Sequence, residues 1–326
     1  MYRIMDALYP HLPLAMRALE RAGPSPWRRK LQELIGSLPP DEVLAGFPTY
    51  RADAAAFRLQ ARWIRERAFE TTAETLPRFV AERIDADIDV LRGWMSGPTG
   101  AIFACPHYGP FVGAAMLLAA EGSTERPANV FYDAPGDVPH NERFDLLFER
   151  FESTLKVLHN HPNDLIKAAR ALRARQCISI MFDVVQRPVD CMYVPFFGRL
   201  YPAMGGTAAL SILSKAPIVP SYTVPLPNCR LEIVFGEAIR PGDYSDLDKE
   251  QAIFEITCAL FKDMERQLTT QPWHWIYWGN VRQSPRYDLG TGLDVQGLRT
   301  ELGRRLSATP QLLKLAPALR ELVDGT

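Results

Sequence analysis

Short apolar segments that alternate with amphipathic segments between residues 84 and 268 constrain the fold most strongly. The apolar segments have the length of strands, and in the amphipathic segments apolar residues recur three or four positions apart, as on one face of a helix. Strands that are covered by helices on both faces are apolar throughout, so this alternation predicts an α/β fold with a mixed, mostly parallel central sheet flanked by helices. The expected strands are 101–104, 129–132, 155–158, 177–182, 217–224 and 231–235, and the expected helices are 111–120, 142–152, 164–173 and 249–268.

Three regions are expected along the chain. Residues 1–83 are predicted to form a helical N-terminal region packed on the core, because 54–70 contains helix-forming residues with apolar positions at helical spacing. Residues 84–285 form the α/β domain, which begins with a half-exposed strand or a turn at 84–90. Residues 286–326 are predicted to be a helical tail. The amphipathic start of the chain could also lie on a membrane surface, but packing on the body of the protein is the more common outcome.

The composition argues against several classes of protein. Of 326 residues, 47% are hydrophobic and 23% are charged, as in a globular protein with a full core. A formal net charge of −1 gives no general attraction to nucleic acid, and no segment approaches the roughly 20 apolar residues of a membrane-spanning helix. The five cysteines are widely spaced and lack a CxxC pair, so neither a disulfide framework nor a structural zinc site is expected. We expect a cytoplasmic protein, with peripheral contact with the inner membrane left open.

His107 is the leading candidate for a catalytic base. It follows the apolar segment 101–104 and Pro106, where a buried strand gives way to a helix. The carboxyl ends of strands are rigid and face a crevice, which suits a catalytic group. Cys105 is an alternative nucleophile beside the imidazole, since residues two apart in a strand share a side. However, Pro106 disturbs this alternation, and buried cysteines are common.

A second informative stretch lies between residues 183 and 210. Phe196 and Phe197 precede a Gly-Arg pair that ends at Arg199, and could form an apolar wall with one cation at its rim. Such a wall would suit an acyl chain on a phosphate-bearing carrier arm; plain core packing of the phenylalanines and carboxylate pairing of the arginine are the alternatives. Gly205 and Gly206 precede an apolar helix, whose first backbone N–H groups could bind an anion or an oxyanion.

Three blocks occur in a fixed order: Ala-Cys-Pro-His-Tyr-Gly at 104–109, Val-Pro-Phe-Phe-Gly-Arg at 194–199, and Ala-Pro-Ile-Val-Pro-Ser at 216–221 followed by Leu-Glu-Ile-Val-Phe-Gly at 231–236. In this order they resemble the bacterial lipid A late acyltransferases, the lauroyl and myristoyl transferases of the lysophospholipid acyltransferase superfamily. The resemblance covers residues 84–282. It implies an α/β fold in which a histidine removes a proton from an acceptor hydroxyl, which attacks a thioester on acyl carrier protein or coenzyme A, with no metal or cofactor.

The resemblance also implies roles for particular residues. His107 matches the family histidine, Asp183 matches an aspartate that ends a strand, and Phe197, Gly198 and Arg199 match the family block. We therefore expect His107 and Asp183 to be catalytic, and the backbone of Gly109, or of Gly205 and Gly206, to bind the oxyanion. The residues expected to bind substrate are Tyr108, Gly109, Phe196, Phe197, Arg199, Gly205 and Gly206.

The chain departs from the family at several positions. The family has an acid five positions after the histidine, but that position is Val112 here, and Asp183, Glu121 or Asp133 would have to replace it in space. The family Tyr-Arg pair is Tyr132-Asp133, the basic cluster near its carboxyl end is changed at 278–282, and no amino-terminal membrane anchor is expected. Lipid A is therefore a poor candidate for the acceptor. A histidine without its acid would be a weaker base, which matters least for a nucleophilic amine, so N-acylation or a specialised small-molecule ester is favoured over membrane lipid synthesis.

The other histidines are expected to be structural. His140 has an acid five positions later but runs into an amphipathic helix, and we expect it to be a solvated residue near the helix start. His159 and His161 could bind a metal, but they lie in a loop pattern without an evident third ligand, so a polar turn is favoured. His274, between two tryptophans, is expected to be a packed or interfacial residue.

We therefore expect an acyltransferase with His107 as general base. Its partners would be acyl carrier protein or a CoA thioester as donor and a small-molecule or lipid acceptor. Two alternatives remain open at this point. One is a catalytically degenerate family member that binds an acyl chain or carrier protein without turnover. The other is a hydrolase that transfers the acyl group to water.

Overall fold

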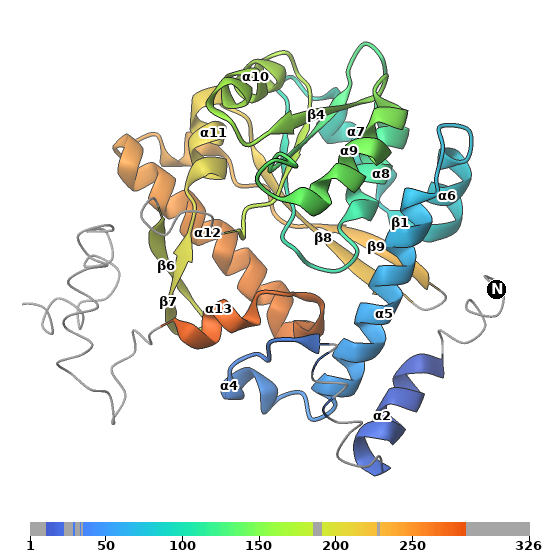
Figure 1. The fold of residues 1–326 in the computed structure, drawn as a ribbon. Coiled ribbons are helices and arrows are strands. Elements are labelled where there is room, and N and C mark those ends of the chain that lie inside the picture. Colours follow the sequence, from blue (N-terminus) through green and yellow to red (C-terminus); the bar gives the residue numbers. More distant parts are fainter. Residues whose placement is uncertain are drawn as a thin grey trace, which may run out of the picture.

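A seven-stranded sheet lies at the centre of the molecule (Figure 1). The computed structural model describes residues 11–22, 29, 33, 35–184, 191–226 and 229–284. The strand order is β1-β9-β8-β2-β5-β3-β4, and all neighbouring pairs are parallel except β8 and β9. The predicted α/β fold with a mixed, mostly parallel sheet flanked by helices is therefore confirmed. The strands are β1 (Ile84–Ala86), β2 (Ile102–Ala104), β3 (Ala128–Tyr132), β4 (Leu155–His159), β5 (Ile178–Ile180), β8 (Ile218–Leu226) and β9 (Arg230–Phe235).

Helices cover both faces of this sheet. The described helices are α2 (Leu12–Ala22), α4 (Asp41–Leu44), α5 (Tyr50–Phe69), α6 (Leu76–Arg83), α7 (Ile88–Ser96), α8 (Val112–Glu121), α9 (Glu142–Phe148), α10 (Pro162–Arg173), α11 (Gly206–Ser214), α12 (Lys249–Thr270) and α13 (Trp278–Gln283), with short 3-10 turns at η2 (Pro139–Asn141), η3 (Glu149–Phe151), η6 (Pro241–Tyr244) and η7 (Pro272–His274). In β2, Ile102 and Ala104 pack in the hydrophobic cluster beneath α10, α11 and α12, whereas Phe103 packs in the cluster beneath α6 to α9. Alternate side chains of one strand thus reach two cores, which explains why the strands are apolar throughout.

The N-terminal helices pack against the body. Helix α5 contributes Tyr50 to the first cluster and Ile64 to the second. Helix α2 lies against α5, where Arg17 Nη2 is 2.8 Å from Asp53 Oδ1. In the part of the chain that the structure describes, no helix combines the length and the apolar character needed to cross a bilayer. The tail expected at 286–326 lies outside the described residues.

A two-stranded antiparallel sheet was not expected from the sequence. Strands β6 (Met192–Phe196) and β7 (Arg199–Ala203) form a hairpin that packs on α12, and Phe197 and Gly198 make its turn with φ of 50° and 65°. The prolines in both strands obscured it, because proline cannot donate to a ladder and reads as a strand breaker. In a sheet with only two strands each strand is an edge, where proline is tolerated.

The segment 84–90 also differs from its expectation. Strand β1 ends at Ala86, and the side chain of Asp87 then accepts a hydrogen bond from the Val90 N–H at 3.0 Å. This N-cap satisfies one of the free donors of the first turn of α7, so the remaining residues are helical.

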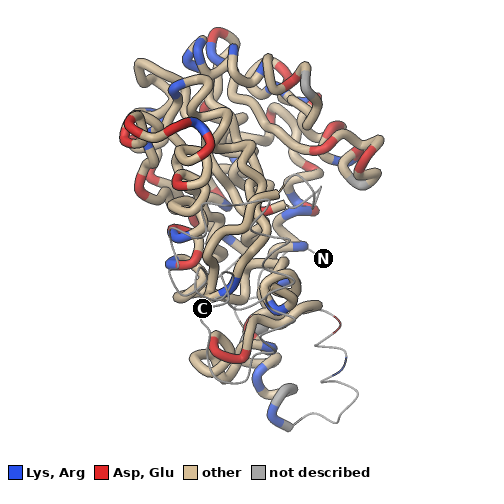
Figure 2. The backbone as a smooth tube through the Cα atoms, turned by 90° about the vertical axis from the view of Figure 1, so that its left-hand side faces the viewer, with Lys and Arg blue, Asp and Glu red and all other residues tan. Residues whose placement is uncertain are grey.

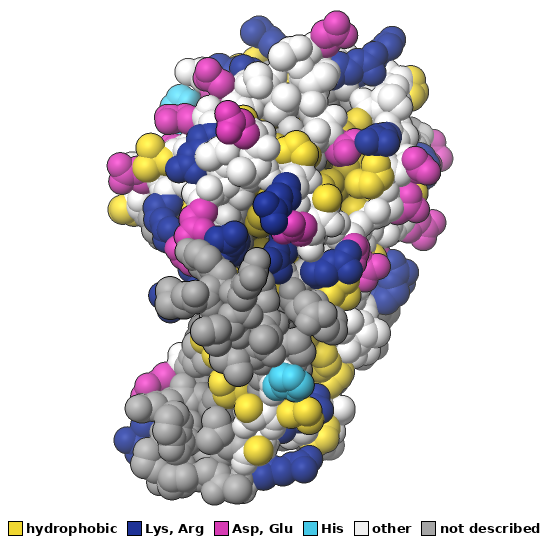
Figure 3. Space-filling view, turned by 90° about the vertical axis from the view of Figure 1, so that its right-hand side faces the viewer, with side chains coloured by type: hydrophobic (Ala, Val, Ile, Leu, Met, Phe, Trp, Pro, Cys, Tyr) yellow, Lys and Arg dark blue, Asp and Glu magenta, His cyan; other side chains and the backbone are white. Residues whose placement is uncertain are grey.

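Charged residues are distributed over the outside of the fold (Figure 2). On the face drawn in Figure 3, Lys and Arg side chains are interspersed with Asp and Glu side chains. This mixture agrees with the formal net charge of −1. The described part of this face therefore offers no extended surface of one sign.

Candidate functional site

His107 lies on a tight turn between β2 and α8 at the carboxyl edge of the sheet. The Tyr108 N–H donates to Pro106 O at 2.6 Å, and Gly109 continues the turn with φ +66°. The turn is tied to neighbouring segments, because Gly109 N–H donates to His274 O at 3.0 Å and the Thr223 hydroxyl donates to Tyr108 O at 2.5 Å. The imidazole is therefore carried by a rigid piece of backbone, as a catalytic group requires.

Asp183 meets His107 because of the register of two parallel strands. Ala104 of β2 pairs with Ile180 of β5, and both His107 and Asp183 lie three residues beyond these partners. Equal offsets from a registered pair bring side chains together at the same edge of a parallel sheet. His107 Nδ1 lies 2.8 Å from Asp183 Oδ1, and the carboxylate is 1% exposed.

Three donors fix the Asp183 carboxylate. Oδ1 is bonded to His107 Nδ1, while Oδ2 accepts from the His107 backbone N–H at 2.8 Å and from Trp275 Nε1 at 2.7 Å. A carboxylate accepts hydrogen bonds, so Nδ1 carries the proton and the lone pair lies on Nε2. Among the described residues, Nε2 has no hydrogen-bond partner. The pair therefore has the geometry of an oriented general base.

This pairing corrects the inference drawn from Val112. Val112 is buried at the start of α8, as its apolar side chain requires. Of the three carboxylates that could replace the family acid, Glu121 pairs with Arg92 at 2.6 Å and Asp133 accepts from Asn160 at 3.2 Å, whereas Asp183 contacts the imidazole. The expectation of a weakened base is wrong, and the preference for an amine acceptor that rested on it lapses.

Two aromatic rings enclose the imidazole. The ring of Phe111 lies 5.2 Å and that of Tyr277 lies 5.0 Å from the His107 ring, both inclined by 67°. The His107 side chain remains 15% exposed between them. Burial, followed by the nearby charges of Asp183 and Asp133, raises the pKa of Tyr277 to about 12, so its phenol is protonated at neutral pH. The ring of His107 is thus held in place while Nε2 stays free to exchange a proton.

The sequence analysis missed Trp275 and Tyr277. Both lie in an aromatic-rich segment at 273–278 that follows the long helix α12. The concentration of aromatic residues was the only sequence signal for this segment. His274 was the one residue of the segment for which a role was predicted. An isolated bridge between Tyr108 and Trp275 brings the segment to the His107 turn.

Cys105 is not suited to nucleophilic catalysis. Its thiol is buried, with Sγ 3.0 Å from Ser221 Oγ and 3.4 Å from Ser179 Oγ. Burial raises the pKa of this thiol. The environment therefore disfavours the thiolate, which is the reactive form.

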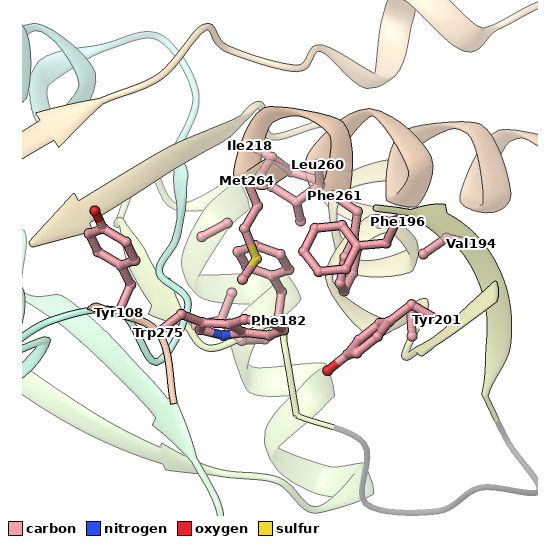
Figure 4. Packing of buried hydrophobic residues seen from close by; sticks show 14 of the residues in the cluster. Tyr108, Phe182, Val194, Phe196, Tyr201, Ile218, Leu260, Phe261, Met264 and Trp275 are labelled. Carbon is pink, nitrogen blue, oxygen red and sulfur yellow. The ribbon is translucent and has the colours of Figure 1, made fainter. Parts of the chain in front are cut away.

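Several residues expected to bind substrate have other roles. Tyr108 and Phe196 are fully buried in the core (Figure 4), so they do not face a substrate. The N–H of Gly109 is occupied by His274 O and is not available to an oxyanion. These three assignments are wrong because side chains and backbone donors near a catalytic turn also have to hold that turn.

The phenylalanine-arginine block is likewise structural. Arg199 Nη1 donates to Ser284 O at 2.9 Å and to Arg282 O at 3.4 Å, which ties the β6–β7 hairpin to the end of α13. Phe197 packs against Trp278 at 5.2 Å between ring centroids, and its N–H donates to Glu265. The expected cation at the rim of an acyl site is therefore used to hold backbone carbonyls.

Gly205 and Gly206 lie far from His107. A Cβ at Gly205 would be 2.7 Å from Ile253 Cγ2, near the beginning of α12. Tyr108, beside His107, bonds instead to Gln267 at 3.1 Å, near the end of the same helix. Gln267 lies fourteen positions after Ile253, a separation of about 21 Å at the helical rise. The expectation that these glycines supply the oxyanion site is wrong.

His159 and His161 have local partners. His159 Nε2 lies 3.9 Å from Asp145, and His161 caps α10 by accepting from the Asn163 N–H at 3.3 Å. The backbone of His140 belongs to η2, and its side chain, expected to be solvated, lies outside the described residues. Within the described ranges, no group of three or more His, Cys, Asp or Glu side chains is placed to hold a metal ion.

His274 is packed in the interior, between the rings of Phe57 and Tyr108. Burial lowers its pKa well below 6.5, so the folded protein keeps it neutral while the unfolded chain binds a proton below about pH 6.5. Its contribution to stability is therefore present at neutral pH and is lost as the pH falls.

Between pH 7.5 and 5.5 the parent protein should lose about 1.4 kcal/mol more unfolding free energy than His274→Phe, as measured by urea denaturation. Equal losses in the two proteins would contradict this role for His274.

One pocket of the described residues is separate from this site. It has a volume of about 840 Å³ and is lined by Thr99 and Pro217, which precede β2 and β8. These residues mark the amino ends of the strands, whereas His107 and Asp183 follow the carboxyl ends. The pocket therefore lies at the opposite edge of the sheet from the histidine-aspartate pair.

No protein-family model matches the chain, and no curated protein matches its sequence.

Proposed function

We propose that the protein is an acyltransferase that moves an acyl group from an acyl-carrier-protein or CoA thioester to an amine or hydroxyl acceptor. The observation that carries the proposal is the His107–Asp183 pair, in which the carboxylate orients the ring and leaves Nε2 free at the carboxyl edge of the sheet. Ligands of open α/β sheets bind at this edge. The resemblance of the ordered sequence blocks to the lipid A late acyltransferases supports the thioester donor.

In the proposed reaction Nε2 of His107 accepts the proton of the acceptor as its oxygen or nitrogen attacks the thioester carbonyl carbon. The new C–O or C–N bond forms, the C–S bond breaks, and the imidazolium returns the proton to the leaving thiolate. Asp183 remains ionised and stabilises the imidazolium, as the acid of a catalytic triad does. The activated group is the thioester itself, so the proposal includes no metal or cofactor. A cytoplasmic location, where these thioesters are made, belongs to the same proposal.

The two alternatives are a binding protein without turnover and a thioester hydrolase. A degenerate binding protein was suggested by Val112, and Asp183 removes that motive by supplying the carboxylate. A thioester hydrolase would use the same pair to activate water. The acceptor therefore decides between transfer and hydrolysis.

The test is an assay of thiol release and product mass with acyl-CoA and acyl-carrier-protein donors, each with and without amine and alcohol acceptors. We expect release that depends on the acceptor, a product heavier by the acyl group, and loss of both in His107→Ala. His161→Ala, which changes an exposed histidine, is the control. Free acid released at the same rate without acceptor would identify a hydrolase, and equal rates in the parent and His107→Ala would refute the proposed base.

A further inference from the structure

Four half-buried aromatic side chains extend from His107 along the carboxyl edge of the sheet. We call Phe111, Tyr132, Phe144 and Tyr277 the aromatic rim. Their ring centroids form a continuous series: His107 to Tyr277 5.0 Å, His107 to Phe111 5.2 Å, Phe111 to Phe144 6.2 Å and Phe144 to Tyr132 6.4 Å. All four remain partly exposed, in contrast to the aromatic residues of the core. Ring faces and edges at this edge of the sheet are therefore available to a ligand that reaches His107.

Asp133 lies beside this rim, and its carboxylate has no Lys or Arg partner among the residues that the structure describes. Asp133 follows Tyr132 at the end of β3, and its Oδ1 accepts from the neutral side chain of Asn160 at 3.2 Å. Its backbone carbonyl accepts from Asn141 at 2.7 Å, so the residue is fixed by two amides. Over the described ranges, Asp133 forms no ion pair with Lys or Arg. Its charge contributes to the raised pKa of Tyr277, which places that charge close to the ring that contacts His107.

The nearest basic side chains of α9 and η3 are used elsewhere. Arg143 lies 4.2 Å from the centroid of the Phe69 ring and 2.9 Å from Glu66, and Arg150 donates to Phe69 O at 2.7 Å and to Thr71 O. Asp145 of α9 adds a second carboxylate near the rim, where it accepts from the Tyr132 hydroxyl. The described surroundings of the rim are thus aromatic and negative.

We propose that the acceptor carries an ammonium group, which binds between Asp133 and the aromatic rim while the nucleophile at its other end reaches Nε2 of His107. This rests on the proposed acyl transfer and narrows its acceptor to small aminoalcohols and diamines. Aromatic faces and a carboxylate are the groups that recognise ammonium ions in proteins. The reaction with an aminoalcohol forms one ester C–O bond, breaks the thioester C–S bond and moves the hydroxyl proton through His107 to the thiolate.

The cationic group and the nucleophile are separate in this proposal. A carboxylate favours the charged form of a neighbouring amine, which cannot attack a carbonyl. Asp133 therefore suits the group that is bound and not the group that reacts. An acceptor with a permanent positive charge and a hydroxyl meets both requirements.

Two matched pairs of probes test this with decanoyl-CoA as donor. Choline is compared with 3,3-dimethyl-1-butanol, in which carbon replaces the charged nitrogen, and 4-amino-1-butanol is compared with 1-pentanol, in which a methyl group replaces the ammonium group. We expect the charged member of each pair to have at least a tenfold higher kcat/KM. The ratio should fall below threefold in Asp133→Asn and invert in Asp133→Lys. Asp137→Asn, an exposed change in the same segment, is the control and should keep the ratio of the parent.

Calorimetric titration with choline and with 3,3-dimethyl-1-butanol, without the acyl donor, measures binding in the absence of turnover. We expect choline to bind at least tenfold more tightly, with the difference lost in Asp133→Asn and reduced in Phe144→Leu. Equal affinities of the two probes, or an unchanged preference in Asp133→Asn, would overturn the inference. Transfer that depends on His107 but ignores acceptor charge would overturn it and leave the acyltransferase proposal intact. Selective binding of choline with no transfer to any acceptor would instead refute the proposed function.

Discussion

Asp183→Asn is expected to lower kcat for acyl transfer about 10³- to 10⁴-fold, the loss seen when the orienting acid of a histidine triad is made neutral. An asparagine can still accept from the backbone of His107 and from Trp275 through its oxygen, so the turn should keep its place. Its amide N–H would then face Nδ1 and favour the tautomer with the proton on Nε2. The ring would be present but would have no lone pair for the acceptor. Steady-state thiol release with the best donor and acceptor measures the effect.

Glu121→Gln is the matched control, since Glu121 was the carboxylate of α8 that sequence alone left as a candidate. Its contact is with exposed Arg92, so we expect activity within about twofold of the parent, as for most surface ion pairs. Circular dichroism and urea unfolding establish that Asp183→Asn is folded. A folded Asp183→Asn protein with more than a tenth of the parental kcat would show that Asp183 does not orient the base.

The central pair could be predicted from the sequence in part. His107 was selected because it follows an apolar strand, and Asp183 was selected because it matches an aspartate of the resembling family. Their contact depends on the pairing of β2 with β5, which sequence position does not reveal, because β3 and β4 lie between them in the chain. A motif with the acid five positions after the histidine covers one short stretch of sequence. Strand register instead brings together residues that are 76 positions apart. Val112 therefore suggested that His107 lacks a carboxylate partner, whereas the pairing of β2 with β5 supplies Asp183.

The predictions for substrate-binding residues failed for a common physical reason. Phe196 and Arg199 were selected for their chemical type, but an aromatic ring is as useful in a core as in a binding wall, and a guanidinium binds carbonyls as well as phosphates. Their surroundings come from α12 and α13, more than 50 residues later in the chain. Periodicity fixes which elements form, and so the strands and helices of the sheet were largely predictable. It does not fix which end of a 22-residue helix a glycine will meet, and this is where the oxyanion assignment went wrong.

Gly109→Ala is expected to lower the free energy of unfolding by about 3–5 kcal/mol, at the upper end of single substitutions. Gly109 has φ +66°, a region that costs an alanine roughly 1–2 kcal/mol, and its new Cβ would lie 1.9 Å from Thr223 O. The clash is with the backbone of β8 at Thr223, which is paired with Ile233 of β9 and cannot move without disturbing that pairing. Urea denaturation measures the loss, and Gly136→Ala is the control, because no atom lies within 4 Å of its added Cβ. The same displacement would move the imidazole from Asp183, so any folded Gly109→Ala protein should also lose transfer activity. Parental stability in this variant would show that the turn is not held against Thr223, and the rigid presentation of His107 would then need another source.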